Sequence, residues 1–353
     1  MNWADMGIEE DGTEQRLITV LDGGIPDRVP YWEYWCNSPT VQRAVLGRPV
    51  ETLRDSFEFC LRTGQDVVGV GFGWRPGCVY GTASDGSYHY LDGSIRTWED
   101  VRSLEPPDVS ADLARLEEML EIAADSTLGV YAMVSSIFDG TYLAMGLETF
   151  SIALYEDRPL VEALMDTLTD FFRGLMEKLA EYDEVRIVQI NDDIARKGGL
   201  WIRPELFREM FVPRMRHILE PLHAARKRLT FHTDGTLDEV IPVLVELGFR
   251  AVHPCEYAAN DIRDLKNKFG GKICLHGNVP TTLLAHGTPE QVGEHVRQLI
   301  EDMKPGGRYI LSSTTSIFEG VKPENFAAMI RAVQRFGRYN ALKGKDAQRP
   351  QEE

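Results

Sequence analysis

The sequence has no cysteine pattern of the kind that builds a disulfide framework or a cysteine-rich metal site. Its five cysteines are odd in number and widely spaced, and no two of them form a C-x-x-C pair. Such usage is typical of proteins in a reducing compartment. The first residues, MNWADMGIEEDGTEQR, are acidic without an apolar h-region, and no apolar run approaches a membrane span. We therefore expect a cytoplasmic protein without a membrane segment.

Clusters of basic residues are also lacking. The 38 lysines and arginines are outnumbered by 55 acidic residues, which gives a formal charge of −17 at pH 7. Nucleic-acid binding depends on neutralising phosphates with grouped basic side chains, so this class of protein is excluded. A polyanionic substrate would need a local basic pocket against the same field.

A glycine-rich phosphate turn after the first predicted strand is lacking as well, which argues against an open doubly wound sheet. Eight apolar runs instead alternate with helix-like segments, the number found in a (β/α)₈ TIM barrel. We expect one domain over residues 1–353, with a lead-in at 1–16 and a frayed tail at 340–353. The predicted strands are 27–35, 66–72, 129–135, 185–191 and the runs that begin LTFHTDG, RAVHPCEY, KICLHGNV and RYILSSTTS.

Between the second and third predicted strands, residues 73–107 are rich in Gly, Ser, Asp and Tyr. This composition predicts a hairpin insertion after strand 2. The hairpin would either form part of a lid or lie on the surface without a chemical role. The predicted helices include 50–63, 111–124, 147–181 with a break at Arg158–Pro159, and 204–226.

Polar side chains follow the last four predicted strands. Because catalytic groups of a barrel collect at the carboxyl ends of its strands, these residues are the first candidates for a site. They are His232 and Asp234, Cys255 and Glu256, His276 and Asn278, and Ser312 and Ser313.

His232 and Asp234 share one face of their strand and can give two ligands to one divalent cation. Alternatively, Asp234 begins an Asx turn into Gly235. Zinc also accepts carboxylate and thiolate, so Glu256, or Cys255 in its place, is a further candidate; regular alternation would turn only one of these two inward.

His276 is either a fourth ligand or a hydrogen-bonding partner of a neighbouring loop. Cys274 shares its face and should lie one layer deeper in the barrel, as a structural residue.

Asp192 and Asp193 form a second polar cluster, beside Asn191. Adjacent carboxylates must be hydrogen-bonded, paired with cations or protonated, so the two are candidate acid–base groups. Asp193 could equally cap the following turn.

Other side chains at strand ends would form a substrate pocket, although aromatic residues in strands are most often core. These candidates are Trp32, Glu33, Trp35, Phe138, Tyr142, Asn191, Asn278 and Ser312.

From about Arg28 to Tyr339 the chain resembles the uroporphyrinogen decarboxylase superfamily. The most specific stretches are NDDIARKGGLWIRPELFREMFVPRMRHIL, FHTDG, ELGFRAVHPCE, LHGNVPTTLLAHGTPEQV and PGGRYILSSTTSIFEGVKPENFAAMI. The resemblance implies a (β/α)₈ barrel and one of two activities. These are cofactor-free decarboxylation of uroporphyrinogen and zinc-dependent methyl transfer to or from corrinoid proteins.

The decarboxylase branch holds its octa-anionic substrate with an M-R-Q-A-G-R segment, where this chain reads EYWCNSP. The branch that methylates thiols carries H-x-C after the fifth strand and a further Cys after the eighth. Here these places hold His232-x-Asp234 and Ser312–Ser313. A harder, oxygen-rich site suits an oxygen substrate, so the resemblance is greatest to the members that demethylate methoxylated compounds.

The resemblance therefore implies an O-demethylating methyltransferase in which Zn²⁺ activates a small methoxylated substrate. The methyl acceptor would be a corrinoid carried by a partner protein, because no corrinoid-binding D-x-H-x-x-G segment occurs in this chain. This partner would dock on the rim near Tyr142, Trp201 and Phe318. The alternatives are a decarboxylase or lyase that uses Asp192 or Asp193 as its acid, and a non-catalytic ligand-binding barrel. The sequence leaves open whether the chain forms a homodimer.

Overall fold

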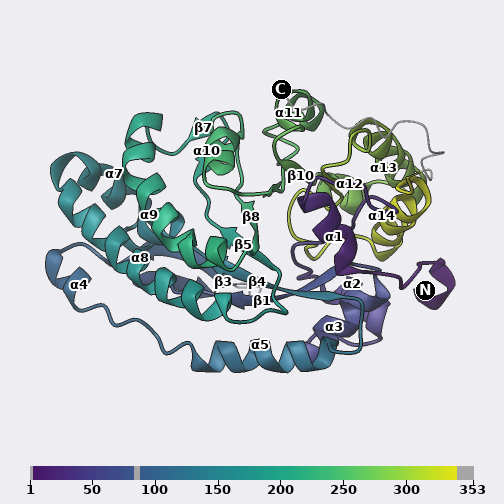
Figure 1. The fold of residues 1–353 in the computed structure, drawn as a ribbon, viewed down its shortest axis with the longest axis horizontal. Coiled ribbons are helices and arrows are strands. Elements are labelled where there is room, and N and C mark those ends of the chain that lie inside the picture. Colours follow the sequence, from purple (N-terminus) through teal and green to yellow (C-terminus); the bar gives the residue numbers. More distant parts are fainter. Residues whose placement is uncertain (1–2, 83–87, 340–353) are drawn as a thin grey trace.

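A computed structural model of the protein describes residues 3–82 and 88–339. Its main feature is a curled, parallel, seven-stranded sheet in the order β1-β4-β5-β8-β9-β10-β11 (Figure 1). The sheet is barrel-like, as expected. The strands are β1 (Val67–Phe72), β4 (Gly129–Ser135), β5 (Ile187–Asn191), β8 (Arg228–His232), β9 (Ala251–His253), β10 (Cys274–His276) and β11 (Tyr309–Ile310).

The segment expected to be the first strand is not a regular strand. Tyr31 and Cys36 form only isolated bridges, to Leu311 and Ile317. On the opposite side, the Asp66 amide donates to the Tyr31 carbonyl at 3.0 Å. Pro30 lacks an amide hydrogen, which is one reason why a continuous ladder does not form here. The segment nevertheless connects the β11 side of the sheet to the β1 side by backbone hydrogen bonds.

Helices cover the outer face of the sheet (Figure 1). The predicted break in 147–181 is confirmed: α7 ends at Glu156 and Pro159 lies in the first turn of α8. The helices are η1 (Trp3–Met6), α1 (Glu14–Leu21), α2 (Pro39–Leu46), α3 (Leu53–Arg62), α4 (Trp98–Arg102), α5 (Ser110–Ala123), α6 (Phe138–Met145), α7 (Leu147–Glu156), α8 (Arg158–Ala180), α9 (Pro204–Ala224), α10 (Val240–Glu246), α11 (Ile262–Phe269), α12 (Thr281–His286), α13 (Pro289–Met303) and α14 (Pro323–Phe336). In the described part of the chain no helix has both the length and the apolar character needed to cross a bilayer.

The interior of the curled sheet is filled by side chains from most of its strands and closed by α1. Leu17 and Leu21 of α1 belong to the same buried cluster as Trp32, Tyr131 and Cys274. Cys274 lies in this cluster as a free, buried thiol, which confirms its expected structural role. Because α1 covers the amino ends of the strands, only the carboxyl ends remain for a site.

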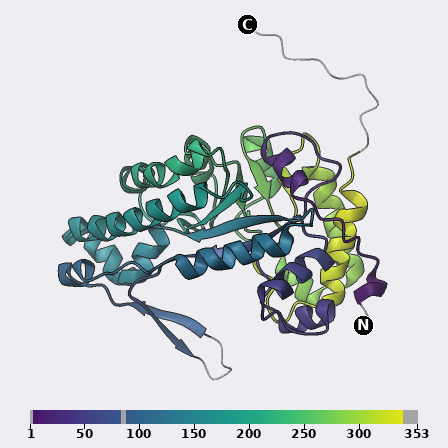
Figure 2. The same cartoon turned by 60° about the horizontal axis from the view of Figure 1, so that its bottom comes forward.

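An antiparallel pair, β2 (Cys78–Thr82) and β3 (Tyr88–Gly93), lies within the irregular segment after β1. It projects away from the helices in Figure 2. The Tyr90 hydroxyl donates to the Leu143 carbonyl at 2.8 Å, which connects the pair to α6. Its connection, 83–87, and the predicted frayed tail, 340–353, lie outside the described residues. Two further two-residue strands, β6 (Ala195–Arg196) and β7 (Gly199–Leu200), pair after β5.

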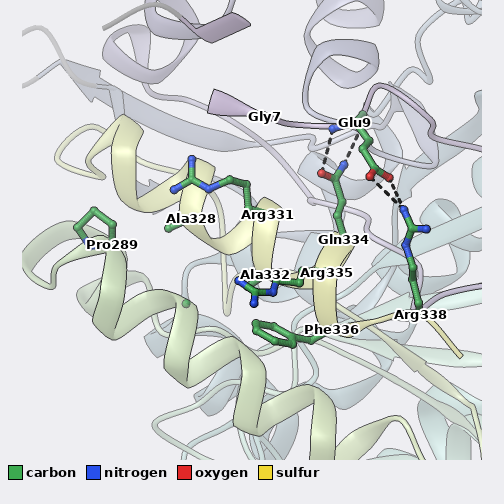
Figure 3. Close-up of a pocket in the computed structure, with 11 residues that line it drawn as sticks. Gly7, Glu9, Pro289, Ala328, Arg331, Ala332, Gln334, Arg335, Phe336 and Arg338 are labelled. Carbon is green, nitrogen blue, oxygen red and sulfur yellow. Dashed lines mark hydrogen bonds and ion pairs between the residues drawn. The ribbon is translucent and has the colours of Figure 1, made fainter. Parts of the chain in front are cut away.

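An open groove of about 540 Å³ lies between the lead-in and helices α13 and α14 (Figure 3). Arg338 pairs with Glu9 at its edge, at 2.9 Å. None of the residues that line this groove lies at the carboxyl end of a sheet strand. It is therefore separate from the candidate site.

Candidate functional site

Three histidines end three consecutive strands and lie in one row at the mouth of the barrel. His232 of β8 is in register with His253 of β9, and His276 ends β10. The ring centroids are 5.0 Å apart for the first pair and 4.4 Å apart for His253 and His276. His253 was not singled out from the sequence. Its place in the row follows from strand register, which no local signal in the sequence gives: Cys274 pairs with Ala251, and the next residues on the same face of the two strands are His276 and His253.

Each histidine of the row makes a hydrogen bond that constrains its tautomer. Nδ1 of His232 lies 2.7 Å from Nδ1 of His253, so one of these nitrogens carries the hydrogen. Nε2 of His276 donates to the Trp32 carbonyl at 2.7 Å. Burial lowers the pKa of His276 to about 3 and that of His253 well below its usual range. The row is therefore neutral, and Nε2 of His232 remains for a ligand.

The cluster that can hold a cation is formed by Asp193, His232 and Asp234. One ligand atom from each lies within 4.8 Å of the other two. The Asp234 amide donates to Asp193 at 3.0 Å, which fixes the two carboxyl groups beside each other. Burial, Asp193 and Glu256 together raise the pKa of Asp234 to about 7. Two close carboxyl groups beside a neutral imidazole match the donor preferences of zinc.

The loop after β8 is held by backbone contacts that allow no other residue at Gly235. Its φ is +92°, and an added Cβ would lie 2.5 Å from the Arg196 amide nitrogen. Its own amide donates to Glu256 at 2.9 Å. On the other side, the Tyr34 ring stacks on His232 at 4.4 Å, with 9° between the ring planes. These contacts position Asp234 and the His232 ring.

The alternation argument for Cys255 and Glu256 fails because β9 ends at His253. Cys255 has a φ of +51° and is fully buried, with Sγ 3.7 Å from the Val252 carbonyl. Glu256 turns toward the amide of Gly235. The cation cluster includes neither of them and does not include His276; the third place is taken by Asp193, which we expected to be an acid–base group.

Asp192 faces away from the cation cluster and holds the amino end of α6. Its carboxylate accepts the amides of Phe138 at 3.0 Å and Asp139 at 2.7 Å. Burial and the neighbouring Asp139 raise the pKa of Asp192. Asp139 pairs with Arg75 at 2.7 Å, and burial still raises its pKa to about 6. The carboxyl groups of Asp192 and Asp139 are thus held by contacts within the protein, to the α6 amides and to Arg75.

Several of the predicted substrate-binding residues are occupied by contacts within the protein. Phe138 and Tyr142 belong to the hydrophobic core, because α6 turns their rings toward Phe150. Trp32 is buried in the barrel interior and contacts Tyr131 at 4.6 Å between ring centroids. Of the expected docking rim, Phe318 is 41% exposed, whereas Tyr142 is 8% exposed.

The polar candidates likewise bond to neighbouring protein groups. Asn191, in register with His232, accepts from Gln189 at 3.0 Å. Asn278 donates to the Cys255 carbonyl at 2.8 Å, and Ser312 donates to the Ser313 carbonyl at the same distance. Only Asn191 of these lies in the row of the histidines.

Glu33 and Trp35 line a cavity of about 340 Å³ beside the row. The Glu33 carboxyl group is 2.6 Å from both the amide nitrogen and the hydroxyl of Ser313. Burial raises the pKa of Glu33 to about 8. Its protonated form completes the hydrogen bonding, since Glu33 then donates to the Ser313 hydroxyl and that hydroxyl donates to the Thr315 carbonyl.

The fold and site define a barrel-like α/β protein with a candidate cation cluster at the carboxyl ends of its strands. A family model described as uroporphyrinogen decarboxylase (URO-D) matches residues 77–336. The chain therefore belongs to the URO-D family, as its sequence motifs led us to expect.

Similar proteins include two uroporphyrinogen decarboxylases, which match this chain at low identity or over a short segment. The uroporphyrinogen decarboxylase of Thioalkalivibrio sulfidiphilus is 23% identical over 329 residues, 86% of each chain. That of Pseudoalteromonas translucida is 36% identical over 76 residues, which span 22% of this chain and 21% of the relative. The chain thus matches the first relative over most of its length and the second over a short segment of higher identity.

Two solved structures share the fold. A methyltransferase from Methanosarcina mazei aligns with a TM-score of 0.70 at 16% identity, over 92% of this chain and 99% of that one. A B12-independent methionine synthase from Shewanella sp. W3-18-1 aligns with a TM-score of 0.50 at 12% identity, over 88% and 96%. At these identities the likeness concerns the fold alone.

Proposed function

We propose that the protein is a zinc-dependent methyltransferase that transfers a methyl group from a small methoxylated compound to the corrinoid of a partner protein. The observation that carries the proposal is the cluster of Asp193, His232 and Asp234 at the strand ends. Membership of the URO-D family and the fold shared with a methyltransferase support it. The absence of an arginine-rich segment at residues 33–39 speaks against uroporphyrinogen as the substrate.

Asp193, Asp234 and Nε2 of His232 would hold the zinc ion. When bound, zinc supplies Lewis acidity toward the ether oxygen and so improves its leaving-group ability. The oxygen-rich donor set suits an oxygen substrate better than a thiol. The rest of the proposal concerns what the protein's own residues do around this cluster.

His253 orients the proposed ligand His232. With Nε2 of His232 given to the cation, Nδ1 carries the hydrogen and donates it to Nδ1 of His253. Such an outer partner fixes the ring orientation and raises the basicity of a ligating histidine. Stacking of Tyr34 on the His232 ring restricts its rotation further and keeps water from that face.

A second candidate is a decarboxylase or lyase acting on a non-porphyrin substrate. It is favoured by the buried Asp139–Asp192 pair, in which burial raises both pKa values and supplies a carboxylic acid near neutral pH. Arg75, paired with Asp139, would bind the substrate carboxylate. Against it, the Asp192 carboxylate already accepts two amides of α6.

The test combines metal content with methyl transfer. We expect about one zinc per chain in the purified protein and its loss in His232→Ala. His253→Phe, which removes the acceptor for His232, should weaken zinc affinity by about 10–100-fold. Conversion of cob(I)amide to methylcobamide should follow addition of a methoxylated aromatic compound and a corrinoid protein. A folded, metal-free protein that releases carbon dioxide from a carboxylate substrate would support the second candidate instead.

A further inference from the structure

The cavity of about 340 Å³ beside the histidine row is lined by aromatic and aliphatic side chains together with polar ones. Phe59 and Cys60 come from α3, and Tyr131 comes from β4. Trp35, which is 45% exposed, lines the cavity where it meets solvent. Small-molecule sites usually have about 300–1,000 Å³, so this volume suits a molecule with a single ring.

The lining of the cavity carries no charge at neutral pH. No lysine or arginine lines the part of the cavity that the described residues form. Burial raises the pKa of Glu33 to about 8 and those of the Cys36 and Cys60 thiols to about 12, so these groups hold their protons. An ionised ligand would lose its hydration here without gaining a counter-charge.

The two glutamine side chains in the lining already have partners within the protein, and the third amide residue, Asn37, is exposed. Gln65 accepts the Glu33 amide and donates to Thr63, at 3.0 and 3.1 Å. Gln42 donates to the Cys36 carbonyl at 2.8 Å and accepts the Val50 amide at 3.0 Å. The cavity therefore recognises its ligand by shape and dispersion rather than by an ion pair.

Tyr34 is shared by the cavity and the candidate metal site. It lines the cavity and its ring stacks on His232. A ring bound in the cavity would thus lie one aromatic layer from a proposed zinc ligand. The groove in Figure 3 differs in both respects, because it is lined by arginines and does not include Tyr34.

We propose that this cavity binds the uncharged aromatic ring of the methoxylated substrate and rejects carboxylated rings of the same size. The identity of the ring as a methyl donor rests on the proposed function, whereas its binding does not. The preference follows from the uncharged lining and from the size of the cavity.

The test uses four probes of nearly equal size: anisole and benzamide, which are neutral, benzoate and benzamidinium. Binding is followed by quenching of tryptophan fluorescence and by calorimetry, with and without added zinc. We expect the neutral probes to bind at least about tenfold more tightly than either ion, which corresponds to about 1.4 kcal/mol. Equal or tighter binding of benzoate, or no binding of the neutral probes, would overturn the proposal.

Substitutions in α3 test whether the neutral probes bind in this cavity. Ser56→Phe and Cys60→Leu introduce larger side chains into the lining and should reduce anisole binding at least tenfold. Arg54→Phe places the same ring on the exposed side of the same helix and should leave binding unchanged. Unchanged binding in correctly folded Ser56→Phe and Cys60→Leu proteins contradicts the proposal.

The two proposals fail separately. If anisole binds, the filling variants abolish binding and no methyl transfer is found with any methoxylated ring, the cavity assignment stands and the methyltransferase proposal fails. If methyl transfer proceeds at the wild-type rate in Ser56→Phe and Cys60→Leu, the cavity assignment fails and the methyltransferase proposal stands.

Discussion

At the scale of single residues, Glu33 shows how burial sets the protonation of this molecule. The residue is 5% exposed, and Ser313 provides the hydrogen-bond partners of its carboxyl group among the described residues. Transfer of a carboxylate from water to such a place is unfavourable, so the acid form is held to about pH 8.

This residue makes stability depend on pH in a defined direction. The pKa of Glu33 is about 8 in the folded protein against an ordinary value of 4.5, so between these pH values the native state binds the extra proton. Its contribution to the free energy of unfolding is complete below pH 4.5 and is lost as pH rises toward 8, by at most about 1.4 kcal/mol per pH unit.

Urea unfolding between pH 4.5 and 8 should therefore show a shallower decline for Glu33→Gln than for the wild type. The comparison isolates Glu33 from Asp66 and Asp234, whose raised pKa values act in the same direction. Parallel pH profiles for the two proteins would mean that Glu33 is ionised in the folded state.

Residue identity predicted part of the site. His232 and Asp234 could be paired from the H-x-D spacing because they are only two residues apart, although β8 ends at His232 and Asp234 lies in the loop that follows. Asp193 and His253 could not be assigned in this way, since their roles depend on the register of β5 and β9 with β8. The turn at Cys255, with its positive φ, has no local signal of the kind that glycine gives.

At the scale of elements, the strands and longer helices followed from apolar periodicity, but α6 did not. Its eight residues are buried almost throughout, so they lack an alternation between exposed and buried faces. Asp192, which directly follows β5, stabilises the amino end of this helix by accepting two of its amides. A contact between segments 54 residues apart is not visible in either segment alone.

Removal of this contact should destabilise the protein without affecting metal binding. Asp192→Ala leaves the Phe138 and Asp139 amides without their acceptor, and should lower the free energy of unfolding by about 1–2 kcal/mol, as for other capping losses. Asp192→Asn, which keeps one acceptor oxygen, should cost less. Urea unfolding and zinc content give the two readouts. Zinc loss in both variants would place Asp192 in the cation site.

At the scale of the whole molecule, the segment at 28–36 connects the two sides of the sheet with few backbone bonds of its own. Asp66 stabilises this junction by accepting the amides of Thr13 and Tyr31 at 2.8 and 2.9 Å. Its carboxyl group also pairs with the buried Arg16 at 3.1 Å. One carboxylate thus joins the lead-in, the irregular first segment and the start of β1.

Asp66→Ala should be among the most destabilising single substitutions, by about 3–5 kcal/mol, because it breaks a buried ion pair and leaves two amides without acceptors. Asp27→Ala is the matched control. It removes a carboxylate that also pairs with Arg16, at 2.8 Å, but whose side chain is 66% exposed, and should cost less than about 1 kcal/mol. Equal costs in urea unfolding would show that burial does not set the strength of this junction.

The barrel-like parallel sheet was predictable because apolar runs that alternate with helical segments favour it whatever the details of each strand. The irregular backbone of the first predicted strand could not be predicted, because its apolar and aromatic residues have the composition of a regular strand. The longer helices could be predicted from the periodicity of apolar residues alone. The site could not, because its residues come together only through the register of neighbouring strands.

The central claim is that Asp193, His232 and Asp234 together hold a zinc ion. Anomalous diffraction on either side of the zinc absorption edge, from crystals grown with zinc, tests it most directly. One strong peak within about 2.0–2.2 Å of an oxygen of each carboxylate and of Nε2 of His232 is the predicted result. No peak at the strand ends, or a peak bound by other residues, would contradict the claim.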